Sequence, residues 1–190
     1  MSHSVFAMEL CFRIEPGSPL QGHLREALYK LPAAMSAREK WEYYRWVSEM
    51  LVNHLSFADA GCWDFWDTDS KAQSDFKMWC DGLFTEEGGR KTPSGPPAPF
   101  RGDVRYMTFT VALLLQYGSY TERGMSRLCN IAEANLWQRA TFAHILRGIR
   151  SISFASVKGD VVYLLPRDAD WGLTAEDLRQ PKFEYLRPLS

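Results

Sequence analysis

Apolar and polar residues alternate along Val5–Ile14, the first patterned segment of the chain. Even positions from Met8 to Ile14 are apolar, whereas Glu9 and Arg13 stand at odd positions. Successive side chains of a strand point to opposite faces, so this period of two places the apolar residues on one face. The pattern predicts a β-strand with one buried face.

Three segments with apolar residues at helical spacing follow, and each begins at a serine with Glu or Gln three residues later. Such a pair forms a capping box, in which the two side chains satisfy free N–H groups of the first helical turn. We therefore expect three helices. The pairs are Ser18 and Gln21 (helix to Leu31), Ser36 and Glu39 (helix to His54), and Ser70 and Gln73 (helix to Leu83).

The longest apolar run, Val104–Tyr117, is rich in β-branched and aromatic residues and predicts a central strand. It follows Thr85–Asp103, whose glycines and prolines predict a long loop. Aromatic residues mix with acids in Phe57–Asp69, which we expect to form an irregular, partly buried connection between helices.

The C-terminal part of the chain predicts further elements. Tyr120–Ile131 is expected to pair with the central strand as a hairpin, and Ala132–Arg147 to form a helix. Ser151–Pro166 holds either one long strand or a hairpin, and the Gly-Asp step within it favours the hairpin. The remaining expected elements are a short helix from Thr174 and an extended tail, Pro181–Ser190.

The order of these elements predicts a single α+β domain over residues 1–190. With the three helices counted as one crossover, the order is β-α-β-β-α-β. This is a ferredoxin-like antiparallel sheet with an expanded first helical crossover. In that topology Val104–Tyr117 becomes an edge strand. Because an apolar edge must be covered, the tail, a second copy of the chain or another protein is expected to cover it.

Charge and composition argue against some classes of partner. The chain carries 22 basic and 23 acidic residues, so it lacks the basic excess that attracts nucleic acid. Its apolar runs are shorter than the ~20 residues of a membrane-spanning helix, and its first residues lack signal-peptide features. Its four cysteines form no CxxC pair and are expected to be free thiols. We expect a soluble, cytoplasmic protein that binds neither nucleic acid nor membranes.

No segment has the spacing of a catalytic or metal-binding motif. The four histidines form no HxH, HxxH or HExxH pattern, and the glycine pair Gly88–Gly89 lacks the spacing of a phosphate-binding loop. We therefore assign no catalytic residue, metal ligand or cofactor, and favour a role other than catalysis. Folding can still assemble a catalytic site from distant residues.

Large aromatic residues supply the candidate binding site. Aromatic side chains can stack on a ligand or anchor a protein interface. We expect a pocket between the aromatic segment 61–67 and the loop 85–103. The candidate binding residues are Trp63, Phe65 and Trp66 from the first segment, and Arg90, Phe100 and Arg101 from the second.

Three segments of the C-terminal half carry a family resemblance: RYMTFTVALLLQYGS, VVYLLP and LTAEDLRQPKFEYLRPL. They resemble a family of uncharacterised domains of cyanobacterial and chloroplast-membrane proteins and of assorted bacteria. The N-terminal stretch VFAMELCFRIEPGSPLQGHL is compatible with the same family. The resemblance implies no catalytic residue.

Two functions follow from these features as hypotheses. The first is a non-catalytic domain that binds another protein or a second copy of itself, based on the aromatic residues, the long loop and the apolar edge. The alternative is a small-molecule-binding or enzymatic domain whose pocket lies between residues 61–67 and 85–103.

Overall fold

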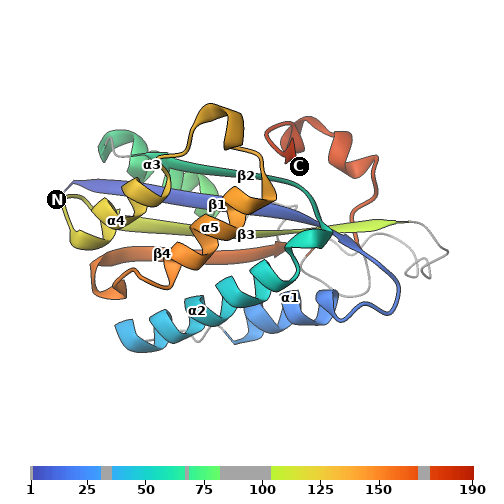
Figure 1. The fold of residues 1–190 in the computed structure, drawn as a ribbon, viewed down its shortest axis with the longest axis horizontal. Helices are drawn as coiled ribbons and strands as arrows, with labels where there is room; N and C mark the ends of the chain where they lie inside the picture. Colours follow the sequence, from blue (N-terminus) through green and yellow to red (C-terminus); the bar gives the residue numbers. More distant parts are fainter. Residues whose placement is uncertain (1, 31–35, 67–68, 82–103, 167–171) are drawn as a thin grey trace.

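A five-stranded antiparallel sheet with the strand order β4-β3-β1-β2-β5 forms the centre of the computed structural model (Figure 1). The structure describes residues 2–30, 36–66, 69–81, 104–166 and 172–190. The strands are β1 (His3–Ile14), β2 (Ala58–Trp66), β3 (Arg105–Gln116), β4 (Val157–Leu165) and β5 (Arg187–Pro188). The helices are α1 (Leu20–Tyr29), α2 (Ala37–Asn53), α3 (Asp69–Asp81), α4 (Tyr120–Leu128) and α5 (Arg139–Ile149). The predicted α+β class is confirmed.

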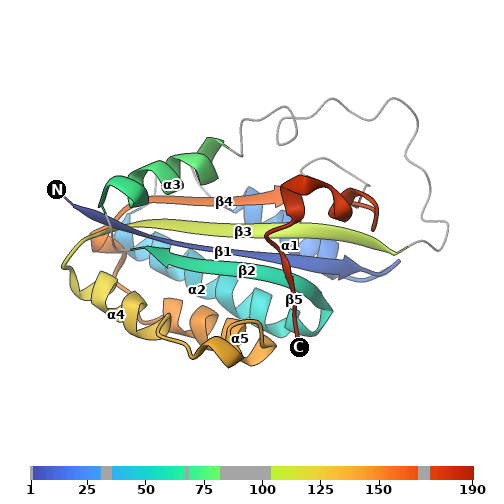
Figure 2. The same cartoon turned by 90° about the horizontal axis from the view of Figure 1, so that it is seen from above.

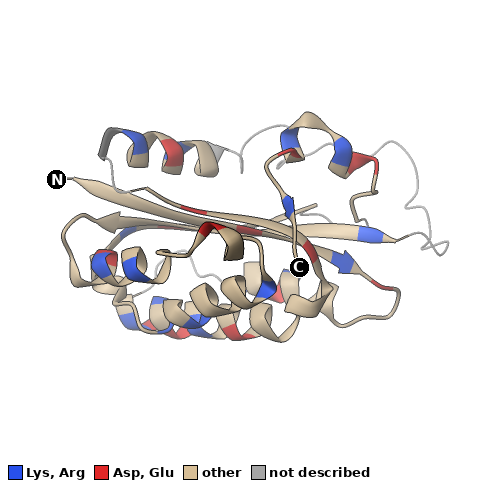
Figure 3. Cartoon of the chain, turned by 45° about the horizontal axis from the view of Figure 1, so that its top comes forward, with Lys and Arg blue, Asp and Glu red and all other residues tan. Residues whose placement is uncertain are grey.

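Helices cover both faces of the sheet. Figure 3 shows α1, α2, α4 and α5 on one face, and α3 with the C-terminal segment on the other. Acidic and basic residues are interspersed along the outer helices in the same view. No helix within the described residues is both long enough and apolar enough to cross a bilayer.

Strand β1 lies at the centre and its two faces differ, as the alternating pattern predicted. It pairs with β3 along its whole length and with β2 on its other side (Figure 2). Its even-numbered residues from Phe6 to Ile14 belong to the main core beneath the four helices. Ala7, on the opposite face, packs with Ala112 and Val161 under α3.

The ferredoxin-like topology is not confirmed, because the strand order differs. β2 and β3 flank β1 and both run antiparallel to it, and α3 connects them across the second face of the sheet. β3 lies between β1 and β4, so the run predicted to become an edge is covered from within the chain. The argument for a partner that covers β3 therefore fails.

The first cause of the wrong topology is β2, which was expected to be an irregular connection. The first half of its sequence, ADAG, is poor in strand-forming residues, and Asp64 interrupts the aromatic residues of the second half. Pairing with β1 nevertheless makes it a strand, because the backbone of a buried central strand needs hydrogen-bond partners on both sides. Tertiary pairing thus overrides local propensity here.

The second cause is α4, which was expected to be a hairpin strand. Ser119 caps this helix by accepting a hydrogen bond from the Glu122 N–H at 3.0 Å. The Ser-x-x-Glu pattern is the one that correctly predicted α2, where Ser36 and Glu39 form a complete capping box. The same pattern at Ser119 was overlooked, so the segment was assigned to a strand.

Several smaller expectations were also wrong. The serine predicted to precede the third helix, Ser70, lies inside α3. Ser18 does take its predicted place before α1, where its hydroxyl accepts a hydrogen bond from the Leu20 N–H at 3.2 Å. Ser151–Pro166 forms no hairpin, because Asp160 lies within β4, where it pairs with Lys40 of α2. Of the helix expected from Ala132, only α5 and a short 3-10 turn, Glu133–Asn135, form. The tail has 3-10 turns at Asp177–Arg179 and Pro181–Phe183 before β5.

Two helical glycines test the packing of α4 against α5. A Cβ at Gly148 of α5 would lie 2.3 Å from Leu128 Cδ1 of α4, whereas a Cβ at Gly124 would meet nothing within 4 Å. Both Gly→Ala changes gain helix propensity, about 0.5–1 kcal/mol. Only Gly148→Ala also overpacks a contact, at a cost of about 1–3 kcal/mol. We expect Gly124→Ala to raise the free energy of unfolding, measured in urea, above that of the wild type. The free energy of unfolding of Gly148→Ala should be about 1–3 kcal/mol lower than that of Gly124→Ala.

Candidate functional site

The outer edge of β2 is only partly covered. Strand β5 pairs with β2 at Ala60 and Gly61 alone, and the Leu189 N–H donates to the Asp59 carbonyl at 3.0 Å. No strand pairs with the outer side of residues 62–66 within the described part of the chain. β2 therefore combines a paired inner half with an open outer half.

The open half presents backbone groups of alternate residues. The Asp59 carbonyl faces outward, because it accepts the hydrogen bond from the Leu189 N–H, and Gly61, two residues further along, faces the same way. Phe65 also faces outward, since its N–H bonds to the Asp64 side chain at 2.8 Å instead of to β1. Alternate residues of a strand direct their N–H and C=O groups to the same side, so those of Trp63 between them face outward too. Among the described residues these Trp63 groups have no hydrogen-bond partner.

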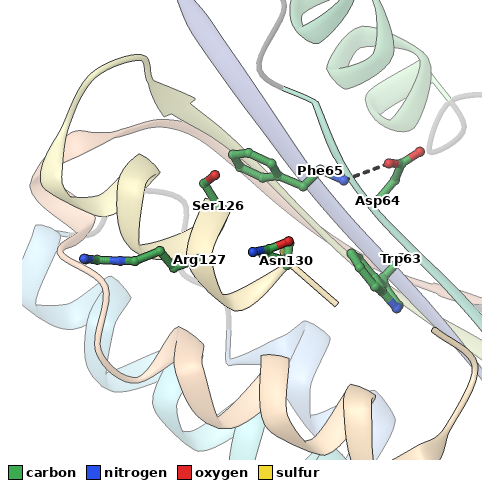
Figure 4. A pocket seen from close by; sticks show the side chains of 7 residues that line it. Trp63, Asp64, Phe65, Ser126, Arg127 and Asn130 are labelled. Atoms are coloured by element: carbon green, nitrogen blue, oxygen red, sulfur yellow. Dashed lines mark hydrogen bonds between the residues drawn. The ribbon is translucent and has the colours of Figure 1, made fainter. Parts of the chain in front are cut away.

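A hollow of about 420 Å³ lies beside this edge, between β2 and the C-terminal end of α4 (Figure 4). Figure 4 shows Trp63 and Phe65 on its strand side, with the Arg127 side chain extending away from Trp63. Its lining residues are Trp63, Asp64, Phe65, Ser126, Arg127, Cys129 and Asn130.

Hydrogen bonds and burial fix the chemistry of the hollow. The Trp63 Nε1–H donates to the Leu136 carbonyl at 3.1 Å, which holds the indole in place. Burial raises the pKa of Cys129 to about 12, so its thiol stays protonated at neutral pH and is a poor nucleophile. The hollow thus offers rigid aromatic surface and hydrogen-bonding groups.

Asp64 places a carboxylate at the middle of the open edge, on the side of β2 that faces away from the main core. Partial burial raises the pKa of Asp64, while the hydrogen bond from the Phe65 N–H lowers it to a smaller extent. The nearby Lys71 ammonium lies 3.8 Å above the ring of Trp66 and pairs with Asp75 at 2.7 Å. A hydrogen bond from the Trp66 side chain and the charge of Lys71 also lower the pKa of Asp64. Among the described residues no ion pair engages Asp64 directly, so its carboxylate can still face a cation from a partner.

The structure brings together two of the six sequence-predicted site residues. Trp63 and Phe65 line the hollow, whereas Trp66 lies on the other face of β2 beneath Lys71. Arg90, Phe100 and Arg101 lie outside the described residues. The α4 side of the hollow was missed, because the segment that supplies it was assigned to a strand. The overlooked Ser119 cap would have revealed this helix.

A row of polar side chains crosses the second face of the sheet. Strand pairing aligns Cys62, Glu9, Thr110 and Tyr163 across β2, β1, β3 and β4. Glu9 is fully buried, and the Tyr185 hydroxyl from the C-terminal segment donates to its Oε2 at 3.0 Å. Polar groups rarely form such a row in a sheet interior, because each needs a partner there.

This row is incompletely hydrogen-bonded. Glu9 Oε1 and the hydroxyl oxygens of Thr108 and Thr110 are buried and make no hydrogen bond of ordinary geometry. Burial raises the pKa of Glu9, and the nearby hydroxyls of Thr108, Thr110 and Tyr185 lower it to a smaller extent. The neutral acid is therefore favoured relative to an exposed glutamate.

Histidines far apart in the sequence meet in the helical layer. The Nδ1 atom of His23 in α1 lies 2.9 Å from Nε2 of His54 at the end of α2. Burial lowers the pKa of His54, and the charge of His23 lowers it further. No group of three or more His, Cys, Asp or Glu side chains that could hold a metal ion occurs in the described ranges. We interpret the pair as a hydrogen bond between the two rings.

Comparisons with protein-family models, curated proteins and solved structures find no match to this chain. The family resemblance inferred from the sequence stays a prediction.

Glu9 predicts a specific dependence of stability on pH. Because its pKa is raised in the folded state, folding favours the protonated form, and stability falls as the pH rises from about 4 through the folded-state pKa. Glu9→Gln keeps the shape and removes the titration. As the pH rises, we expect the free energy of unfolding of Glu9→Gln to increase relative to that of the wild type. The difference should level off above the folded-state pKa of Glu9.

Urea unfolding between pH 4 and pH 9 measures the difference. Glu133→Gln, at an exposed position, is the matched control and should differ little from the wild type at any pH. A difference between Glu9→Gln and the wild type that stays constant with pH would show that Glu9 is not held in a buried site.

Proposed function

We propose that this protein binds an extended segment of another protein, which adds to the outer edge of β2 as a further strand. The observation that carries the proposal is the unpaired edge at Trp63–Phe65 with a hollow directly beside it. In strand addition, main-chain hydrogen bonds supply affinity and hollows for alternate side chains supply specificity. The sequence hypothesis of a non-catalytic interaction domain is thus kept, with β2 in place of β3.

The chain already carries out this kind of addition with its own tail. Arg187 and Pro188 pair with Gly61 and Ala60 on the same edge, and the Leu189 N–H extends the pairing to Asp59. A partner strand that lies against Trp63 and Phe65 would continue the line of β5. The edge therefore has the geometry to accept a strand.

Charge indicates the chemistry of the partner. To pair with an antiparallel strand through Trp63 and Phe65, the Phe65 N–H must leave the Asp64 carboxylate, to which it donates at 2.8 Å. The residue opposite Asp64 then falls at the position where cross-strand side chains come closest. A Lys or Arg there would contribute about 0.2–1 kcal/mol. The flanking side chains point toward the rings of Trp63 and Phe65. We therefore expect a basic residue between apolar residues.

The same geometry disfavours pairing between two copies of this chain. Gly61 is occupied by β5, so within the described part of β2 a twofold axis that pairs position 63 of one copy with position 65 of the other passes through residue 64. The Asp64 carboxylates of the two copies would then lie directly opposite each other, which destabilises the pairing. We therefore favour a different protein as the partner.

The hollow fits a small-molecule or catalytic site less well. Such sites are mostly apolar with few polar groups, whereas Asp64, Ser126, Arg127 and Asn130 make up much of this lining. Within the described residues Ser126 has no hydrogen bond to a general base, and Cys129 is protonated at neutral pH. The second wall expected for such a pocket, residues 85–103, lies outside the described residues.

Selection from a phage-displayed library of random 12-residue peptides tests the proposal. We expect the wild-type protein to enrich sequences with Lys or Arg between apolar residues. Asp64→Lys should change that preference to Asp or Glu, because the charge opposite the central residue is reversed. A synthetic copy of the most enriched wild-type peptide should bind Asp64→Lys about two- to fivefold more weakly, measured by fluorescence polarisation.

Two controls separate strand addition from other binding. Glu42→Lys reverses an exposed charge on α2 and should select the wild-type peptides. Trp63→Ala and Trp63→Pro both remove the indole ring. Only Trp63→Pro also removes the outward N–H, so the Trp63→Pro variant should bind the peptide more weakly than the Trp63→Ala variant. The proposal is wrong if the wild type enriches no sequence, or if the same peptide binds all four variants equally.

A further inference from the structure

The C-terminal segment occupies the inner half of the proposed binding edge. From Phe183 to Ser190 it runs across the second face of the sheet and ends beside β2, as the red trace in Figure 2 shows. Apolar contacts anchor it, because Phe183 and Leu189 are buried. At its end the Ser190 N–H donates to the Trp137 carbonyl at 3.1 Å.

Between these anchors, one hydrogen bond joins the segment to the centre of the sheet. The Tyr185 hydroxyl donates to Glu9 Oε2 at 3.0 Å, and the Tyr185 ring packs edge-on against Trp79 of α3 with the ring centres 6.3 Å apart. Arg187 and Pro188 themselves are exposed. Main-chain hydrogen bonds hold the end of the segment, including one from the Arg139 N–H to the Ser190 carbonyl at 2.9 Å. Tyr185 adds a side-chain hydrogen bond from the middle of the segment to the centre of the sheet.

The polar row that Tyr185 reaches contains buried oxygen atoms without hydrogen bonds of ordinary geometry. Glu9 Oε1 and the hydroxyls of Thr108 and Thr110 have no partner of ordinary geometry, and a buried polar atom without a partner is unfavourable. Water would supply these hydrogen bonds when the segment lifts. The unpaired atoms thus lower the free-energy difference between the docked and lifted states.

We propose that residues 183–190 form a displaceable strap that competes with the partner strand for the β2 edge, held closed by the Tyr185–Glu9 hydrogen bond. This inference rests on the proposed function. When the strap lifts, Asp59 and Gly61 join Trp63 and Phe65 as outward-facing positions, so the partner gains a longer edge. The strap is autoinhibitory, and the bound partner holds it open.

Tyr185→Phe tests the strap, because it removes the hydroxyl and keeps the ring against Trp79. In the full chain without peptide, we expect the Leu189 and Ser190 amides to exchange with solvent about five- to tenfold faster than in the wild type. Amides of the α2 core, such as that of Leu51, should not change. Tyr163→Phe removes a hydroxyl from the same polar row outside the strap, and should leave Leu189 and Ser190 as in the wild type.

Peptide affinity then tests the competition. The most enriched wild-type peptide should bind Tyr185→Phe more tightly by the same five- to tenfold factor, since a rarely open edge lowers apparent affinity in proportion to its population. Equal affinity for both proteins would overturn the strap while leaving strand addition intact. Binding to neither protein would overturn the proposed function. If the Leu189 and Ser190 amides exchange at the same rate as the Leu51 amide in the core, the strap opens only when the whole protein unfolds, and the inference is wrong.

Discussion

The pairing of the central strand β1 on both sides is the constraint on which the rest of the structure depends. A strand buried on both faces can satisfy its backbone groups only through neighbouring strands. β3 meets this need on one side, and β2 meets it on the other. β2 has little strand propensity of its own, so its role in the sheet comes from β1. On this side of β1 the last long strand is therefore β2, which is held in the sheet mainly by its pairing with β1.

That origin explains the candidate site. A strand held from one side keeps unpaired groups on the other, and proteins commonly cover or charge such edges. Here β5 covers Ala60 and Gly61, and Asp64 charges the open part. We expect these features to protect the edge against pairing with a second copy, and we propose that the same charge selects the partner. The buried Glu9 links the two halves, because it holds the segment that covers the inner one.

The sequence predicted the parts of the fold that local patterns determine. The alternation in β1, the apolar run of β3 and the capping box of α2 each specified an element correctly. β2 could not be predicted in this way, because glycine, alanine and aspartate dominate it and only pairing with β1 makes it a strand. Trp63 and Phe65 were found through their size, yet their role depends on which side of β2 is unpaired. Glu9 looked like an ordinary polar position in a half-buried strand, because only α3 and Tyr185 bury it.

Amide hydrogen exchange at Trp63, measured by NMR on the full chain, tests the central claim most directly. Outward and inward amides alternate along β2, so the Asp64 N–H is directed toward β1. The account predicts that the Trp63 amide exchanges on the order of 100-fold faster than that of Asp64, because it has no hydrogen-bond partner. Equal protection at Trp63 and Asp64 would show that the edge is already paired and would contradict the account.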